Sequence, residues 1–154
     1  MLCEVLPRSQ WIRALCAADE RRVLDLAERL SRDLDAQPTS NPCAGLQLLR
    51  LRESVTLDTF YIGEIAVTSA SVQLRTPGGN RVEGGAIVMD DRIELASALA
   101  VLDGVLAFNL PGAKEADRLL QEGQEALDRK DRIRAAMLSR TKAGFSLMAE
   151  AGND

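Results

Sequence analysis

The segment of residues 60–89 constrains the fold of this chain more than any other part of its sequence. Residues 60–75 alternate apolar and polar side chains in the pattern of a half-buried β-strand. Thr76-Pro-Gly-Gly-Asn80 follows, and its glycines can adopt the positive φ angles of a turn. Residues 81–89 then return as a second strand. The chain must therefore contain an antiparallel hairpin, and its remaining elements must pack against it.

The apolar side chains of the long strand change face part-way along it. Ile65 and Val67 lie on one face, whereas Ala70 and Val72 lie on the other. This change predicts either a bulge or a strand whose two ends are covered differently. Another strand, predicted over residues 46–53, completes an antiparallel meander of three strands.

Two helices are predicted before the strands. The first covers residues 8–18, with Ser9 available as its N-cap. Asp19 can cap the second, which is amphipathic because apolar side chains recur along one face and charges lie on the other. The apolar face of this second helix consists of Val23, Ala27, Leu30 and Leu34.

Two more helices are predicted after the strands. Asp90 or Asp91 caps the first, which runs to about Phe108 and is apolar around most of its circumference. Such a helix is buried on more than one side, and one of those sides could face a partner chain. A charged helix follows over residues 114–138, interrupted by Gly123. We expect a single α+β domain over residues 1–154, in which an N-terminal helical pair and two C-terminal helices accompany the meander.

The chain contains no histidine among its 154 residues. This removes the usual general base near neutral pH, the Ser-His and Cys-His nucleophile pairs, and most catalytic metal sites. The formal net charge of −4, with acids and bases interleaved, argues against a nucleic-acid partner. The three cysteines, without CxxC spacing, are typical of free thiols in a reducing compartment. Without a signal peptide or a membrane span in the sequence, we expect a soluble, cytoplasmic protein.

Few residues are candidates for chemistry of their own. The glycine pairs at 78–79 and 84–85 lack a phosphate-binding motif, and turns or bulges explain them better. Asp90, Asp91 and Glu94 could hold a divalent cation, but capping of the following helix explains the aspartates without a metal. We therefore predict no catalytic, cofactor-binding or metal-binding residue in this chain.

Asp103 and Trp11 have more than one interpretation. Asp103 interrupts an apolar stripe, so its carboxylate must be exposed, paired within the chain, or supplied to a partner. Trp11 is better explained as a core anchor than as a surface for ligand stacking.

Read in order, four segments resemble the PhnG family, a small subunit of the bacterial carbon–phosphorus lyase core complex. RSQWIRAL at 8–15 resembles the family's R-x-x-W-M-x-x-L, and PCAGLQLLR at 42–50 resembles P-E-T-G-L-V-M-V-R. FYIGEIAVTSASVQL at 60–74 resembles F-N-L-G-E-V-T-V-T-R-C-A-V-R-L and is the most specific match. TKAGFSLM at 141–148 is similar to T-K-V-D-F-F-T-M.

The departures from the family pattern fall at polar positions. Ser69 and Gln73 replace two arginines, and Gly144 replaces the aspartate of the tail. The family's G-R-D-x-x-H-A-E motif is barely preserved, and a gap-free reading places Leu95 at its histidine. The positions that determine shape persist, which favours a packing role over a ligand-binding one.

The resemblance implies a subunit that assembles first with a PhnI-like chain and then with PhnH- and PhnJ-like chains. That assembly attaches a phosphonate to C1′ of ATP and displaces adenine, as an alpha-D-ribose 1-methylphosphonate 5-triphosphate synthase. A radical S-adenosylmethionine subunit then breaks the carbon–phosphorus bond. ATP would be a substrate of the complex, this chain would carry no cofactor, and alone it would be inactive. A scaffold protein of another pathway and a stand-alone nucleotide-binding enzyme are the alternatives.

We expect the isolated chain to form a homo-oligomer, because its third helix and its tail carry more apolar surface than one small core buries. Membrane contact is not expected. The residues predicted to contact a partner are Trp11, Phe60, Tyr61, Gly63, Glu64, Asp103, Phe145, Leu147 and Met148.

Overall fold

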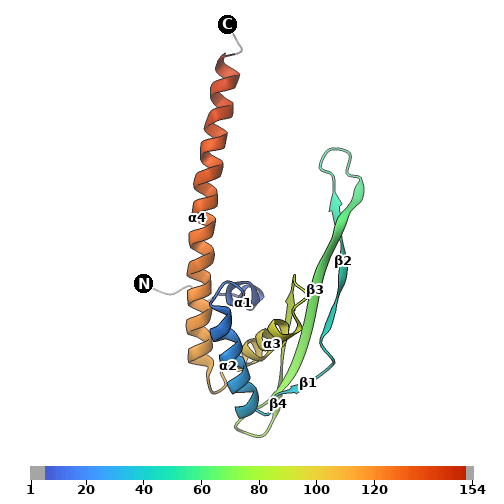
Figure 1. The fold of residues 1–154 in the computed structure, drawn as a ribbon, viewed down its shortest axis with the longest axis vertical. Helices are drawn as coiled ribbons and strands as arrows, with labels where there is room; N and C mark the ends of the chain where they lie inside the picture. The colour runs from blue at the N-terminus through green and yellow to red at the C-terminus, as the bar shows by residue number, and fades with distance from the viewer. Residues whose placement is uncertain (1–5, 152–154) are drawn as a thin grey trace.

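The computed structural model describes the backbone of residues 6–151 and the side chains of residues 6–140. It has an α+β fold in which two long elements project from a small core (Figure 1). One projection is a β-hairpin and the other is the C-terminal helix, and both extend toward the same end of the molecule. None of the described helices combines the length and the apolar composition needed to cross a bilayer.

The sheet is antiparallel and is built around its longest strand, β3 (Thr59–Arg75). The strand β2 (Cys43–Arg52) pairs with residues 59–69 of β3, and β4 (Arg81–Val88) pairs with residues 68–75. A two-residue strand, β1 (Gln37–Pro38), pairs with residues 72–73 of β3, on the edge opposite β4. The predicted meander is thus present. The sheet also contains a fourth strand, β1, which the sequence does not predict.

The change of apolar face in β3 coincides with a change in what covers the strand. From Thr68 onward β3 pairs with β4, and Thr68, Ala70, Val72 and Leu74 are buried. Among the residues that the structure describes, β2 alone pairs with β3 before Thr68. The second of the two predicted explanations is therefore confirmed: the two ends of this strand are covered differently. A bulge is also present, but it lies at Ile62, where the register shifts opposite Leu49 and Arg50.

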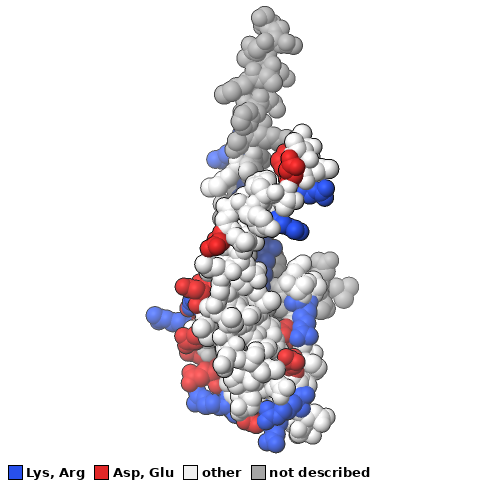
Figure 2. Space-filling view, turned by 90° about the vertical axis from the view of Figure 1, so that its right-hand side faces the viewer, with Lys and Arg blue, Asp and Glu red and all other residues white. Residues whose placement is uncertain are grey.

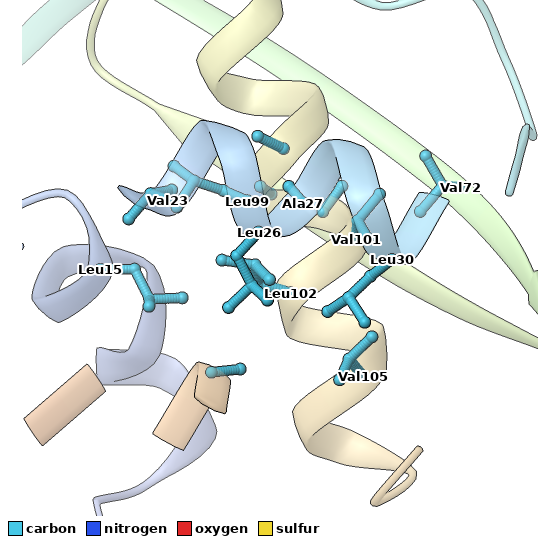
Figure 3. Close-up of a cluster of buried hydrophobic side chains, with 14 of the residues drawn as sticks. Leu15, Val23, Leu26, Ala27, Leu30, Val72, Leu99, Val101, Leu102 and Val105 are labelled. Atoms are coloured by element: carbon cyan, nitrogen blue, oxygen red, sulfur yellow. The ribbon is translucent and has the colours of Figure 1, made fainter. Parts of the chain in front are cut away.

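The helix α3 (Ile93–Ala107) forms the centre of the core. It packs on β3 and β4 and also contacts α1 (Arg8–Leu15), α2 (Glu20–Asp33) and α4 (Ala113–Ala151). Figure 3 shows leucine and valine side chains of α2 and α3 that point toward one another. The chain itself thus buries this helix on several sides. A partner is not needed to explain its apolar circumference.

Helix capping follows the sequence at one of three predicted positions. The Asp19 carboxylate accepts a hydrogen bond from the backbone N–H of Arg22 at 3.0 Å, so the predicted cap of α2 is confirmed. The N-cap of α1 is Pro7 rather than Ser9, and α1 ends at Leu15, three residues before its predicted end.

The helix α3 begins after Arg92, and no side chain caps it, so the predicted Asp90 or Asp91 cap is wrong. The Asp90 side chain instead accepts a hydrogen bond from the Asp91 N–H at 2.8 Å. The Asp90 carbonyl accepts one from the Thr68 hydroxyl at 2.6 Å. These bonds fix the link between sheet and helix, so the Asp90 side chain stabilises the link rather than the helix end.

Two glycines allow backbones to pack closely. A Cβ on Gly84 would lie 2.2 Å from the Ala100 carbonyl oxygen, so α3 lies directly against β4. A Cβ on Gly123 would lie 1.9 Å from the carbonyl oxygen of Ala14, where α1 crosses α4. The predicted interruption of α4 at Gly123 is wrong, because this helix is continuous and extends well beyond residue 138. Gly84 likewise serves helix packing rather than a turn or a bulge.

Candidate functional site

The β2–β3 projection is exposed along most of its length, and we call residues 43–67 the arm. All ten residues of β2 are exposed, and so are the first six of β3. Leu46 and Leu48 are 67% and 61% exposed, values typical of charged residues rather than of leucine. In Figure 2 a broad surface without charged residues runs along this side of the molecule, and the charges gather at its margins.

Both faces of the arm are apolar. Strand alternation places Leu46 and Leu48 on the face that, farther along β3, packs against α3. Leu49 and Leu51 lie on the opposite face, where Leu51 is paired with Phe60. In a sheet with one buried face, the other face is usually polar. An arm with leucines on both faces therefore exposes apolar surface whichever way it turns.

The tip of the arm is ordered by the Glu53 carboxylate. This carboxylate accepts hydrogen bonds from the backbone N–H of Val55 at 2.8 Å, from that of Thr56, and from the Thr56 hydroxyl at 3.0 Å. The hydrogen bond from the Thr56 amide is the main cause that lowers the pKa of Glu53 below its ordinary 4.5. The Arg52 guanidinium donates to the carbonyl of Leu57 at 3.2 Å. The arm thus ends in a fixed turn rather than a loose loop.

In contrast to the arm, Asp103 is buried and fully paired. Its side chain is 5% exposed and accepts two hydrogen bonds from the Arg8 guanidinium, at 3.0 and 2.7 Å. It also accepts one from the backbone N–H of Gly85 at 3.0 Å. The hydrogen bonds between Arg8 and Asp103 raise the pKa of Arg8. The sequence predicts that Asp103 is exposed, paired within the chain, or supplied to a partner, and the structure shows that it is paired within the chain.

The predicted partner-contact residues fall into three groups. Phe60, Tyr61, Gly63 and Glu64 lie together in the exposed part of the arm. Trp11 and Asp103 lie in the core instead: Trp11 is half-buried, and its indole N–H donates to the Leu6 carbonyl at 2.9 Å. The side chains of Phe145, Leu147 and Met148 lie outside the described residues.

Sequence reasoning missed the leucines of β2 as surface residues. Apolar side chains lie on both faces of this strand, with Leu46 and Leu48 on one face and Leu49 and Leu51 on the other. This pattern indicates that neither face is designed to contact water. The same pattern is also typical of a strand buried on both faces. The sequence alone could not show that the chain leaves both faces uncovered.

Two hollows with arginines in their lining lie on the described surface, one between α2 and α4 and the other within the arm. Arg22, Arg29 and Arg118 line one between α2 and α4, where Glu122 pairs with Arg22 and Glu115 with Arg29. Arg50 and Arg52 line the other, near the tip of the arm. Both buried polar side chains that the structure describes, Thr68 and Asp103, are occupied by the hydrogen bonds given above. Within the described residues, no cluster of three or more carboxylate or thiol ligands could hold a metal ion.

A model of one protein family matches residues 6–150 of the chain, and its description is "Phosphonate metabolism protein PhnG". A search of curated proteins found no match. The family match includes both the core and the arm, so it describes the whole architecture rather than one motif. The chain therefore belongs to the PhnG family and has a role in phosphonate metabolism.

Proposed function

We propose that this chain is an accessory, non-catalytic subunit of the carbon–phosphorus lyase complex. In this role it supports the transfer of a phosphonate to C1′ of ATP with release of adenine. The observation that carries the proposal is the arm, which is apolar on both faces and projects from a core that is already closed. The family match supports a role in phosphonate metabolism, and the reaction is part of the proposal, as the resemblance to the family implies it.

A two-stranded ribbon is at best marginally stable in water unless something packs against it. Exposed leucine and phenylalanine side chains add an unfavourable hydration term of about 25 cal/mol for each Å² of apolar surface. Exposed apolar surface of this kind marks a protein-binding site. The uncharged surface along this side of the molecule has charged residues at its margins (Figure 2). The arm is thus best explained as an element that a neighbouring subunit covers.

The total surface of the chain supports the same conclusion. A compact monomer of 16.7 kDa exposes about 7,600 Å² by the scaling of accessible surface with mass, whereas this chain exposes 11123 Å². Both projecting elements, the arm and α4, contribute to this excess of about 3,500 Å², which lies within the total area that obligate complexes bury.

The chemistry of the chain favours a partner that supplies the reacting groups. The sequence has no histidine, and the two buried polar side chains of the described region hold the fold together. We infer that a PhnI-like subunit binds this chain first and that PhnH- and PhnJ-like subunits join the assembly. ATP is then a substrate of the complex rather than a ligand of this chain. The free thiols of Cys16 and Cys43 fit a reducing compartment, so we place the complex in the cytoplasm.

Two phenylalanines of nearly equal exposure allow a matched test. Phe60 lies in the arm and is 44% exposed, and Phe108 lies at the end of α3 and is 46% exposed. Phe60→Asp should prevent co-purification with a co-expressed PhnI-like subunit, because it places a charge inside the apolar interface. Phe108→Asp should co-purify like the wild type, and thermal melts should show that both variants fold.

The activity assay uses ATP and methylphosphonate, with adenine release as the readout. The chain alone should release no adenine, and the wild-type complex should release it. Adenine release by the repurified chain alone would refute the accessory role. Equal co-purification of both variants would show that the arm is not the partner surface.

A further inference from the structure

The two edges of the sheet differ in how well they are protected. On the edge formed by β4, the N–H of Gly85 points away from β3 and donates to the Asp103 carboxylate. Arg8 holds that carboxylate in place from α1. A buried side chain thus occupies a backbone donor that an incoming strand would need. Such blocking is a common protection against edge-to-edge pairing.

The edge formed by β2 has no comparable protection. Within the described residues, β2 pairs only with β3, so the outward N–H and C=O groups of a ten-residue strand remain open. The strand contains no proline, and its two charges, Arg50 and Arg52, lie near one end. The bulge at Ile62 is in β3 and leaves the repeat of β2 unbroken. An edge that is long, regular and apolar is a template for another strand.

The opposite edge of the arm, along residues 59–67 of β3, is a poorer template. It carries the extra residue Ile62, which disturbs the spacing of its hydrogen-bonding groups. β4 begins to pair with β3 at Thr68, so β4 also limits the length of this edge. An added strand should therefore choose β2.

The sequence of β2 is self-complementary in one antiparallel register. If Gln47 faces Gln47 of a second copy, Leu46 faces Leu48 of that copy, and the two-fold axis repeats the contact. Four leucines then meet on one face. In the same register Arg50 faces Ala44 of the second copy, so no arginine lies opposite an arginine.

We propose that β2 pairs antiparallel with β2 of a second copy of this chain, around a two-fold axis at Gln47. The two arms then form one four-stranded sheet. Pairing satisfies the open backbone groups of β2 and buries leucines of both chains, which is consistent with the excess surface of the single chain. The proposal concerns the chain by itself and does not rest on any partner subunit or on the phosphonate reaction.

Disulfide cross-linking tests both the pairing and its register. Cys3, Cys16 and Cys43 are first replaced by serine, and Gln47→Cys is then introduced into that background. Directly opposed residues of antiparallel strands have Cα atoms about 4.5–5.5 Å apart, within the range that a disulfide spans. Mild oxidation should therefore convert Gln47→Cys into a covalent dimer on a non-reducing gel.

Ser54→Cys in the same background is the matched control. Ser54 is also exposed on the arm, but it lies at the tip, in the turn after β2. In the proposed dimer the two tips are at opposite ends of the sheet, about 45 Å apart at about 3.3 Å per residue. Ser54→Cys should stay monomeric on the gel, and equal cross-linking of the two variants would overturn the proposed pairing.

Sedimentation of the untagged wild-type chain provides a readout without a disulfide. We expect a mass of twice 16.7 kDa, and a monomer for Leu48→Lys, which places a charge among the four leucines. Circular dichroism should show an unchanged fold for this exposed position. A wild type that is monomeric at all concentrations would overturn the proposal.

Discussion

Asp103 shows how a single residue determines which parts of this molecule are open to other proteins. Its carboxylate is buried, yet it costs the fold little because Arg8 and the Gly85 N–H satisfy it from two directions. The same bonds close the β4 edge of the sheet. The pair is asymmetric, because the Arg8 side chain is half exposed and the Asp103 side chain is not. Loss of either partner therefore has different consequences.

Arg8→Met should destabilise the fold by about 3 kcal/mol, because it leaves a buried carboxylate without its cation. Arg13, on the same helix, is the matched control, since its pair with Asp131 is long, at 3.7 Å, and exposed on both sides. Arg13→Met should cost less than about 1 kcal/mol. Urea denaturation of both variants measures the difference. If the two variants lose the same free energy of unfolding, burial of Asp103 does not strengthen the Arg8–Asp103 ion pair.

Glu53 predicts a pH dependence at the tip of the arm. The pKa of Glu53 in the folded chain lies below its ordinary 4.5, mainly because the Thr56 N–H donates to the carboxylate. The ordering of the turn should therefore be complete above pH 4.5 and be lost as the pH falls through the lower, folded pKa. The amide chemical shift of Thr56 should follow this titration in NMR spectra. A midpoint at or above pH 4.5 would contradict the hydrogen bonds at the tip.

At the scale of elements, glycines set the distances between helices and the sheet. Gly84 lets α3 approach β4 closely. Gly123 has no side chain, so the backbone of α1 can lie directly against α4 where the two helices cross. A helix propensity scale treats Gly123 as a defect in α4, but packing reverses that judgement. The arm provides the contrast, since Gly45 has open space where its Cβ would be.

Gly123→Ala should destabilise the chain by about 1–3 kcal/mol, because its methyl group overlaps the Ala14 carbonyl. Helix propensity alone predicts the opposite sign, a gain of about 1 kcal/mol. Gly45→Ala, which meets nothing within 4 Å, serves as the control and should change stability little. Thermal melts decide between the two signs. A stabilised Gly123→Ala variant would show that α1 can move away from α4 at little cost.

At the scale of the whole molecule, folding and association occupy different parts of the chain. The buried core consists of α1–α3, the first part of α4, β4 and the second half of β3. The arm contributes none of its β2 residues to that core. Its apolar side chains are therefore free for contacts with other chains.

Replacement of residues 45–67 by Asn-Gly should leave a folded core. Ala44 and Thr68 are directly opposite each other in the sheet, so a two-residue turn can join them. We expect cooperative unfolding within about 5 °C of the wild type, because the arm adds little to the buried core. The variant should also lose self-association. Circular dichroism melts and sedimentation measure the two properties, and a non-cooperative melt would show that the arm is part of the folding unit.

The local chemistry of the sequence predicted much of the fold. Alternation along residues 60–75 located β3, the turn at 76–80 located the start of β4, and Asp19 located the start of α2. The phase change in β3 predicted either a bulge or two differently covered ends, and the structure decided for the second. These features depend on neighbours along the chain, which the sequence contains directly. The resemblance of its segments to the PhnG family also agrees with the match over residues 6–150.

Only the tertiary structure decided which apolar surfaces stay open. Helix α3 and strand β2 are both apolar on all sides in the sequence, yet α3 is enclosed by the sheet and by helices, and β2 is exposed along its whole length. The partner of Asp103 lies 95 residues away, and the backbone that explains Gly123 belongs to α1. Burial is a property of three-dimensional neighbours, and periodicity reports only which side chains share a face. Apolar composition therefore predicts that a surface will be covered, while the arrangement of the elements decides whether this chain or another one covers it.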